Sequence, residues 1–294
     1  MIYTLENDSL SIKVNSLGAE LQSLFHKTTN TELLWQANKD FWPRHAPVLF
    51  PIIGRLNNDT LRNGDNSYPI TQHGFARDSE FDLLSQTEAS LQLQLISNEK
   101  TKKHFPYDFK LVLKYSLNDD NLDCSFIVNN PSKSTLPFSI GGHPAFNWPL
   151  VPGLIKEEHR IIFEKPEANT VSQLESGLIR TDEAPSPVHD KILSLKEDLF
   201  ANDALIFKRT NSKKIRYEAL KNDSVSGFIE MEFNDFSDLG IWTKPGADFV
   251  CLEPWNGYSS DVDFSGDFAT KPGVILLPGE STQSFTFSIK ANIN

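Results

Sequence analysis

The chain has 294 residues, 39% of them hydrophobic, and a formal net charge of −11 spread along its length. This is enough for one large all-β domain, since sandwiches and barrels often run past about 200 residues as a single unit. The acidic balance argues against nucleic acid or an anionic membrane as a partner, because both bind clustered lysine and arginine.

Apolar and polar residues alternate with a period of two along much of the chain, as in strands with one buried face. The clearest segments are 10–14, 91–95, 111–117, 122–128, 229–233 and 285–289. The turn sequence NDDN joins the third to the fourth, which predicts a hairpin over residues 109–130. We predict an all-β fold, a large antiparallel β-sandwich with few short helices, as a single domain over residues 1–294.

Other segments carry weaker signals. Residues 57–66 (NNDTLRNGDN) and 277–280 (LPGE) are predicted turns. Residues 164–190 are rich in proline, glutamate and serine, which favours a long surface excursion. Residues 192–202 are expected to hold one or two turns of helix.

The N-terminal sequence MIYTLENDSL has neither the basic nor the apolar region of a signal peptide, and no apolar run approaches a membrane span. The two cysteines, Cys124 and Cys251, have no metal-binding or redox spacing. We expect a cytoplasmic protein, a monomer or homodimer, with no membrane partner.

Six ionisable residues stand in unusual surroundings. They are Arg55 in FPIIGRL, His73 and Arg77 in QHGFAR, His143 in GGHPAF, Asp203 in FANDALIF and Glu253 in DFVCLEPWNG. Each also has a purely structural interpretation. A lone histidine is often a satisfied structural group, and Arg55 and Asp203 could equally form an ion pair.

Glu253 is the most informative of the six. Alternation places it on one strand face with Phe249 and Cys251, and a carboxylate is costly to bury there without a partner. Pro254 and Trp255 are expected to end the strand, so Glu253 would lie at its mouth. The structural alternative is a glutamate paired with an arginine or capping a loop.

His143 lies in the sequence SIGGHPAFNWP. Glycine weakens a strand interior, and proline removes a backbone donor and fixes φ. Gly141, Gly142 and Pro144 are therefore expected to make a sharp turn that presents the imidazole.

Two other chemistries fit less well. His45, His73 and His143 could form a three-histidine metal site, but no closely spaced ligand pair supports it. Asp203 and Glu253 could serve glycoside hydrolysis, which would leave the histidines without a role.

The motifs around five of these residues resemble, in the same order, those of the aldose 1-epimerase (galactose mutarotase) family. They are GR at Arg55, HGF at His73, GGHPAF at His143, NDALIF at Asp203 and CLEPW at Glu253. The resemblance covers nearly the whole chain and is strongest to the LacX-like branch. It implies a galactose mutarotase-like supersandwich.

The resemblance also implies an activity, the interconversion of the α and β anomers of a hexose through the open-chain aldehyde. Glu253 would be the general base on the anomeric hydroxyl and His143 the general acid on the ring oxygen. His73 and Arg55 would hold ring oxygens, and Asp203 would bind sugar hydroxyls. Neither a metal nor an organic cofactor is implied. The glycines would let the sugar approach, and Phe146 or Trp148 would wall the groove.

Three alternatives stay open within this resemblance. The substrate could be a hexose 6-phosphate, with Arg77 as a phosphate ligand. Against that, Arg77 could form a salt bridge with Asp78, Glu80 or Asp82. The protein could also bind carbohydrate without turnover, or act as a metabolic sensor. We favour free aldoses, because few basic residues are available and the net charge is negative.

Overall fold

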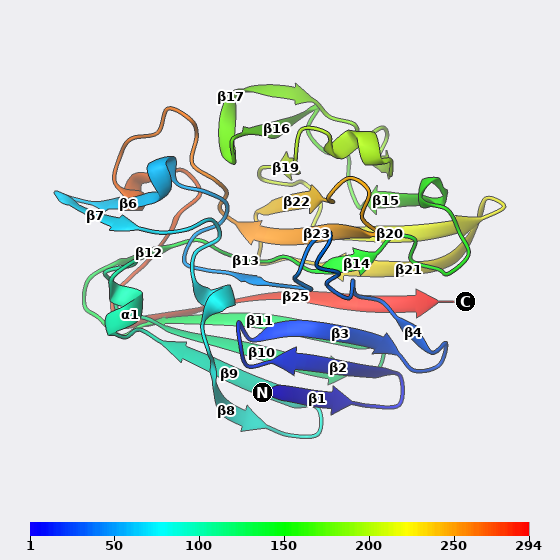
Figure 1. Ribbon diagram of the computed structural model, residues 1–294, viewed down its shortest axis with the longest axis horizontal. Helices are drawn as coiled ribbons and strands as arrows, with labels where there is room; N and C mark the ends of the chain where they lie inside the picture. Colours follow the sequence, from blue (N-terminus) through cyan, green and yellow to red (C-terminus); the bar gives the residue numbers. More distant parts are fainter. Residues whose placement is uncertain (294) are drawn as a thin grey trace.

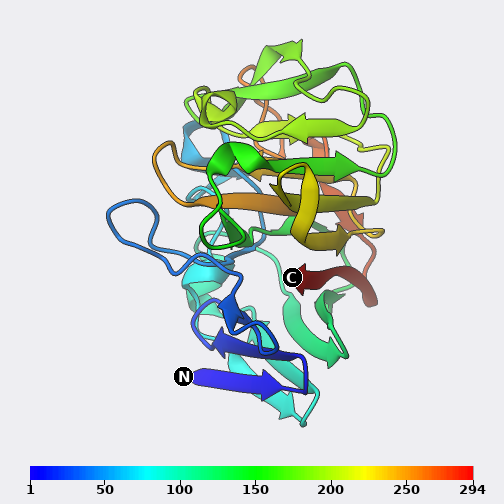
Figure 2. The same ribbon diagram turned by 90° about the vertical axis from the view of Figure 1, so that its right-hand side faces the viewer.

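The computed structural model describes residues 1–293 and confirms the predicted all-β antiparallel fold. Two large sheets dominate it (Figures 1 and 2). One has nine strands in the order β18-β15-β20-β21-β25-β11-β10-β9-β8. The other has eight, ordered β17-β16-β19-β22-β23-β13-β5, with β14 also paired to β23. A four-stranded N-terminal sheet and the β16–β17 hairpin lie at opposite ends of the molecule.

The strands have the following bounds. The nine-stranded sheet contains β8 (Asp82–Gln86), β9 (Ser90–Ile96), β10 (Lys110–Asn118), β11 (Asn121–Asn130), β15 (His159–Phe163), β18 (Ile192–Ser194), β20 (Lys214–Lys221), β21 (Ser224–Glu232) and β25 (Ser281–Ile293). The eight-stranded sheet contains β5 (Val48–Leu49), β13 (Ile140–Gly142), β14 (Ala145–Asn147), β16 (Thr170–Glu175), β17 (Leu178–Pro185), β19 (Leu205–Phe207), β22 (Asp238–Trp242) and β23 (Phe249–Asn256). The smaller sheets are formed by β1 (Ile2–Glu6), β2 (Leu10–Asn15), β3 (Glu20–His26) and β4 (Thr31–Glu32), by β6 (Thr60–Asn63) with β7 (Asn66–Pro69), and by β12 (Leu136–Phe138) with β24 (Ile275–Leu277).

Helical structure is short. The α-helix α1 spans Glu99–Lys102, and 3₁₀ segments span Asn57–Asp59, Ala76–Asp78, Lys156–Glu158, Glu197–Phe200 and Phe268–Thr270. Among the described residues, no helix has the length and apolar character needed to cross a membrane.

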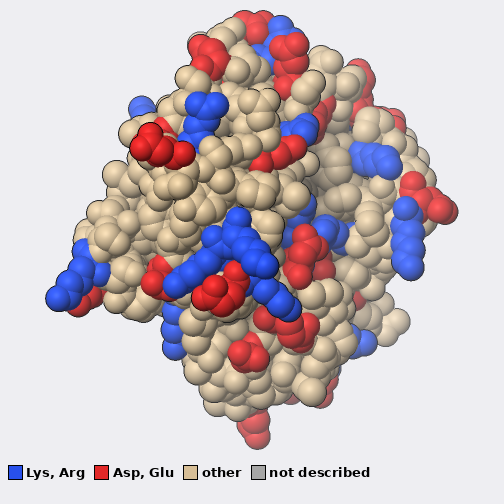
Figure 3. Space-filling model, turned by 60° about the vertical axis from the view of Figure 1, so that its left-hand side comes forward, with Lys and Arg blue, Asp and Glu red and all other residues tan. Residues whose placement is uncertain are grey.

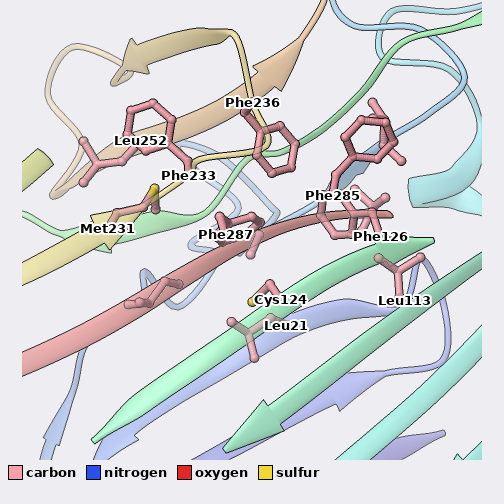
Figure 4. Close-up of a cluster of buried hydrophobic side chains, with 14 of the residues drawn as sticks. Leu21, Leu113, Cys124, Phe126, Met231, Phe233, Phe236, Leu252, Phe285 and Phe287 are labelled. Atoms are coloured by element: carbon pink, nitrogen blue, oxygen red, sulfur yellow. The ribbon is translucent and has the colours of Figure 1, made fainter. Parts of the chain in front are cut away.

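The alternating segments place their apolar side chains in one large buried cluster that runs from Leu5 to Ile293. Strand β11 shows the pattern clearly, since every second residue along it is buried. In Figure 4, Phe126 of β11 and Phe287 of β25 lie in the part of this cluster below Leu252 of β23. The rings of Phe126 and Phe287 pack edge to face with centroids 5.8 Å apart. Both rings come from the nine-stranded sheet, and the Phe287 ring packs across the core against Gly142 of β13 in the eight-stranded sheet.

The predicted hairpin over 109–130 is confirmed, with β10 and β11 joined around Asp119, whose φ is 52°. Two expectations were incomplete. Residues 164–190 are largely exposed, as expected, but include the hairpin of β16 and β17 at the edge of the eight-stranded sheet, and residues 57–66 contain the whole of β6 between turns. Residues 192–202 combine strand β18 with one 3₁₀ turn.

Strand β23 carries the centre of the eight-stranded sheet and continues through Pro254 to Asn256. The expectation that Pro254 would end it was wrong. On one side β23 pairs with β22 from Cys251 to Trp255, and on the other it pairs first with β14 and then with β13. Between those two partners, at His143 and Pro144, the ladder is interrupted. Because Pro254 lies beside this interruption, its missing N–H leaves the strand intact.

Candidate active site

Glu253 and His143 meet at the interruption between β13 and β14. The pairing register is the same on both sides of it, with Gly141 opposite Trp255 and Ala145 opposite Cys251. That register places His143 opposite Glu253, with both side chains on one face. His143 Nε2 lies 3.2 Å from Glu253 Oε2, and the two residues are 7% and 1% exposed.

The glycines before His143 serve packing rather than a turn, which corrects the sequence interpretation. Both lie in strand β13. A Cβ on Gly141 would come within 2.6 Å of Trp255 Cδ1 and 2.7 Å of the Pro254 carbonyl oxygen. A Cβ on Gly142 would come within 2.9 Å of the Phe287 ring. Their missing side chains let β13 lie close to β23 and β25, and this close approach holds His143 against Glu253.

A pocket of about 300 Å³ opens above the pair. Its walls include five of the six predicted residues, from segments far apart in the chain: His73, Arg77, His143, Asp203 and Glu253. It adjoins a more open groove of about 470 Å³, and Leu174, Asp203 and Trp242 line both. The pocket has room for one hexose ring, with the groove beyond it for substituents.

His73 is held in a strained backbone turn, with φ of 65° before Gly74 at 72°. Its Nδ1 accepts a hydrogen bond of 3.1 Å from the Gly54 N–H. The neutral ring must therefore carry its proton on Nε2. Burial lowers the pKa of His73 well below its ordinary value, helped by His143 and Arg77, so His73 offers the pocket a neutral N–H donor.

Arg77 reaches the pocket because the 3₁₀ turn at Ala76–Asp78 bends the chain back. Its Nη2 donates to the Gln72 carbonyl oxygen over 2.8 Å, and its Nε lies 3.7 Å from Asp78 Oδ2. Asp78 is bound more closely by Arg44, at 2.8 Å. Burial, with Arg44 nearby, lowers the pKa of Arg77 to about 10. The Arg77 Nε is buried and makes no hydrogen bond.

Asp203 stands at the turn before β19 with φ of 76°. Its Oδ1 accepts from the Ala204 N–H over 2.8 Å. Its other oxygen makes no hydrogen bond within the described chain, so Asp203 can accept from a ligand hydroxyl at the pocket wall.

Arg55 does not join the other five residues. Its guanidinium forms two hydrogen bonds of 2.7 Å with Asp59, and Nη1 donates to the Ser176 carbonyl oxygen over 3.2 Å. The ion pair with Asp203 is not formed either. The chain turns at Gly54, with φ of 63°, and directs Arg55 away from the pocket toward the β16–β17 turn. A role for Arg55 in sugar binding stays a prediction without support from this geometry.

The aromatic walls differ from those expected. Phe146 and Trp148 are fully buried in the core, so neither walls the pocket. Trp42 instead stacks on the His143 ring with centroids 5.0 Å apart at 27°, and Trp242 meets that ring edge-on at 5.8 Å. Sequence analysis missed Trp42, because it lies in a loop without alternation and only tertiary packing brings it to His143.

Burial determines the electrostatics of the pair. It raises the pKa of Glu253 well above its ordinary value, with a further rise from the negative charge of Asp203. It lowers the pKa of His143 to about 3, with smaller contributions from Arg77 and Arg44. The two shifts together favour the arrangement in which Glu253 is protonated and His143 is neutral. Such a pair can exchange protons with two oxygens of one ligand.

Comparison with known proteins identifies the family. Residues 1–287 match the aldose 1-epimerase family. The chain belongs to that family. The protein LacX (chromosomal) of Lactococcus lactis subsp. lactis is 32% identical over 301 residues, covering 98% of this chain and 99% of its own length. The resemblance drawn from the motifs, including its LacX-like branch, is confirmed.

Two solved structures are similar over nearly the whole chain. A galactose mutarotase related enzyme from Lactobacillus acidophilus has a TM-score of 0.93 at 34% identity, covering 99% of this chain and 97% of its own. A galactose mutarotase-like protein from Lactobacillus casei ATCC 334 has a TM-score of 0.91 at 30% identity, covering 99% and 100%. The sandwich of this aldose 1-epimerase family member is thus of the galactose mutarotase-like type.

The histidines considered as a metal site do not gather in the described part of this family member. His73 and His143 are in contact, with ring centroids 5.6 Å apart, but His45 is absent from the pocket wall. His143, Cys251 and Glu253 offer ligand atoms within 4.8 Å of one another. Cys251 is fully buried beside Phe249, and burial raises its pKa well above the ordinary value. A neutral thiol in apolar packing does not fit a metal ligand, which must be a thiolate.

Proposed function

We propose that this chain is an aldose 1-epimerase that interconverts the α and β anomers of a hexose by acid–base ring opening and reclosure. The observation that carries the proposal is the buried pair of Glu253 and His143, 3.2 Å apart at the base of a pocket lined by hydroxyl-binding groups.

The reaction moves one proton onto the pair and one off it. Glu253 accepts the proton of the anomeric hydroxyl while His143 donates a proton to the ring oxygen. The bond between C1 and the ring oxygen breaks, and C1 and its hydroxyl oxygen become an aldehyde. After rotation about C1–C2, the steps reverse on the other face of the carbonyl. The pair ends with the proton it began with, so no cofactor is consumed.

These roles predict a pH dependence for the reaction. A base that must be ionised and an acid that must be protonated work only while the pair holds one proton. We expect kcat/KM to fall as the pH drops toward about 3, where His143 keeps its proton while Glu253 is also protonated. It also falls as the pH rises through the raised pKa of Glu253. Between these two pH limits the pair holds its one proton mostly on Glu253, whereas the reaction needs that proton on His143. The small population of the reactive arrangement limits the plateau of kcat/KM.

The other pocket residues would bind the sugar. His73 supplies the N–H donor derived above, and Asp203 supplies an acceptor. Trp42 and Trp242 can pack against the apolar face of a pyranose and keep the His143 ring in place.

The test is anomer exchange measured by NMR over a panel of aldoses. Glu253→Gln keeps the shape of the base and removes its function, so kcat should fall by about 100-fold or more. The exposed Glu157→Gln is the matched control and should retain wild-type kcat. If Glu253→Gln keeps more than about a tenth of kcat, Glu253 is not the principal base.

His143→Asn tests the acid in the same assay. Asn can keep a hydrogen bond but cannot supply the proton, so the variant should lose turnover and still bind sugar in calorimetry. Loss of binding with unchanged turnover per bound sugar would assign His143 to binding instead. A wild type that binds hexose without exchanging anomers would favour a carbohydrate-binding protein.

A hexose 6-phosphate is the second candidate substrate, and the buried, unbonded Nε of Arg77 beside Arg44 favours it. Basic and acidic side chains otherwise lie interspersed on the face shown in Figure 3. The deciding measurement is kcat/KM for a hexose and its 6-phosphate, with wild type and Arg77→Ala. A strong preference for the phosphate that disappears in Arg77→Ala would replace the free-sugar proposal.

A further inference from the structure

Four side-chain atoms of pocket-lining residues are buried without a hydrogen bond: Arg77 Nε, His143 Nδ1, Glu253 Oε2 and the indole Nε1 of Trp255. Glu253 Oε2 has only the 3.2 Å contact with His143 Nε2 described above. Glu253 and Trp255 lie on the same face of β23, two positions apart. A buried donor or acceptor left without a hydrogen bond costs about 1–3 kcal/mol, so such a group in a native fold requires an explanation.

The indole of Trp255 is held in a socket built from two glycines. Gly141 lies opposite Trp255 on β13, and a Cβ there would come within 2.6 Å of indole Cδ1. Gly240 lies opposite Glu253 on β22, and a Cβ there would come within 2.5 Å of indole Cη2. The ring therefore crosses β23 toward the position of Glu253, and any larger residue at either glycine would displace it.

We propose that the Trp255 indole N–H is the hydrogen-bond donor that stabilises the Glu253 side chain in its ionised form, and that Gly141 and Gly240 hold it there. Trp255 is thus a positioning residue for the base, and this role rests on the proposed function. A donor-only N–H serves this purpose because it binds the carboxylate and cannot compete for its proton. Nε1 is closed to solvent and has no other hydrogen-bond partner, and the buried Glu253 carboxyl two positions away on the same face has an oxygen that lacks a hydrogen bond.

The neighbours of Glu253 otherwise oppose ionisation. Asp203 faces it with negative charge from the turn before β19, and Cys251 lies beside it on β23. His143, opposite on the neighbouring segment, is neutral over most of the pH range, and His73 behind it is neutral as well. Strand β22 places only Gly240 opposite Glu253. Trp255 is the group acting on Glu253 in the opposite direction, toward the carboxylate.

The first experiment is the pH profile of anomer exchange for Trp255→Phe, with the spontaneous rate subtracted at each pH. Phenylalanine keeps an aromatic ring and removes the donor. Loss of a hydrogen bond to a charged group should raise the pKa of Glu253 by about one to two pH units. The alkaline fall in kcat/KM should then move to higher pH by that amount, and the plateau should be about 10- to 100-fold lower. At still higher pH the profiles of the variant and the wild type should converge.

The control is Trp148→Phe, which removes an indole N–H that already donates to the Lys156 carbonyl oxygen in the core. It should leave both limb and plateau in place. If Trp255→Phe lowers the rate equally at every pH with the alkaline limb unmoved, Trp255 has only a structural role and the proposal is wrong.

A second measurement does not depend on turnover. The chain has five tryptophans, so ¹⁵N-labelled protein should show five indole N–H signals. One should titrate with the midpoint of Glu253 and stop titrating in Glu253→Gln. If none does, the contact is absent and the proposal fails, even where the epimerase activity is found. If the wild type exchanges no sugar but this signal titrates, the proposed function fails and the contact stands.

The socket has its own test. Gly240→Ala should displace the indole and reproduce the shifted limb of Trp255→Phe, and the double variant should lose little more than either single variant. If the losses in kcat/KM of the two single variants add fully in the double variant, Gly240 and Trp255 act independently, which would contradict the socket.

Discussion

At the scale of one residue, the ionised Glu253 that the proposed reaction needs is unfavourable for the stability of the fold. Its carboxyl is 1% exposed, and burial raises its pKa, so it resists the ionisation that the reaction needs. A group whose folded pKa is raised contributes stability that is present below its unfolded pKa and lost as pH rises through the folded value. His143 has the opposite sign, because its lowered pKa favours the fold above its unfolded pKa and less so as pH falls toward about 3.

Glu253→Gln is therefore expected to increase stability while removing activity. Above the unfolded pKa of glutamate, the wild type loses about 1.4 kcal/mol per pH unit relative to the variant, up to the folded pKa of Glu253. Urea denaturation from about pH 4 to pH 8 measures this difference, which should be near zero at the acidic end. A difference that does not grow with pH would show that Glu253 ionises freely in the fold.

Arg55→Ala is expected to leave kcat/KM within about 3-fold of wild type. Its side chain is 42% exposed and paired with Asp59 outside the pocket wall. Loss of an exposed ion pair should cost at most about 1 kcal/mol in stability. Steady-state kinetics beside His73→Ala, which removes a pocket donor, provides the contrast. A drop comparable to that of His73→Ala would return Arg55 to the substrate-binding set.

At the scale of elements, the site depends on how closely β13 approaches β23. The interruption at His143 and Pro144 frees a histidine from the ladder without changing the register on either side. The sheet thus places an acid opposite a base, supported by strands rather than by a mobile loop. Rigid strand positions are suited to holding proton-transfer groups in place.

Alanine at either glycine of β13 tests this approach. Gly141→Ala would bring a Cβ against the backbone oxygen of Pro254, whereas Gly142→Ala meets side-chain atoms, the rings of Phe287 and Phe126. Backbone atoms yield less than a side chain, so Gly141→Ala should destabilise more, within about 1–3 kcal/mol. Chemical denaturation of both variants measures it. Equal losses would indicate that the two contacts relax alike.

On the scale of the whole molecule, the nine-stranded sheet is a support on which the eight-stranded sheet carries the chemistry. Its strands contribute buried apolar side chains to the core, and the pocket is lined from the other sheet and its loops. Damage to the support should therefore reduce stability with little effect on the chemistry of the folded molecules.

Leu93→Ala and Leu83→Ala compare a buried and an exposed leucine paired across β9 and β8. Leu93 is fully buried, so its truncation should cost about 2–5 kcal/mol. Leu83 is 46% exposed and should cost under about 1 kcal/mol. Thermal unfolding and kcat of both proteins check this. A large loss of kcat in folded Leu93→Ala would show that the support also shapes the site.

The sequence by itself determined the strands and the candidate residues. Alternation is a local property, and it predicted the hairpin over 109–130 and the shared face of Cys251 and Glu253 because side chains on a strand repeat every second residue. The order of the motifs identified the family. Glu253 and His143 could be selected because an ionisable group in apolar surroundings is costly wherever the chain folds.

Only the tertiary structure decided which of these residues meet. The opposition of His143 and Glu253, the separation of Arg55 and the stacking of Trp42 depend on contacts between segments far apart in the chain, which no local pattern records. The same applies to Gly141: a glycine has no side chain to signal its purpose, and its role becomes visible only when the indole of Trp255 occupies the space a Cβ would need. Strand order and close approach are set by the packing of the whole core, so they follow from the fold rather than from any single segment.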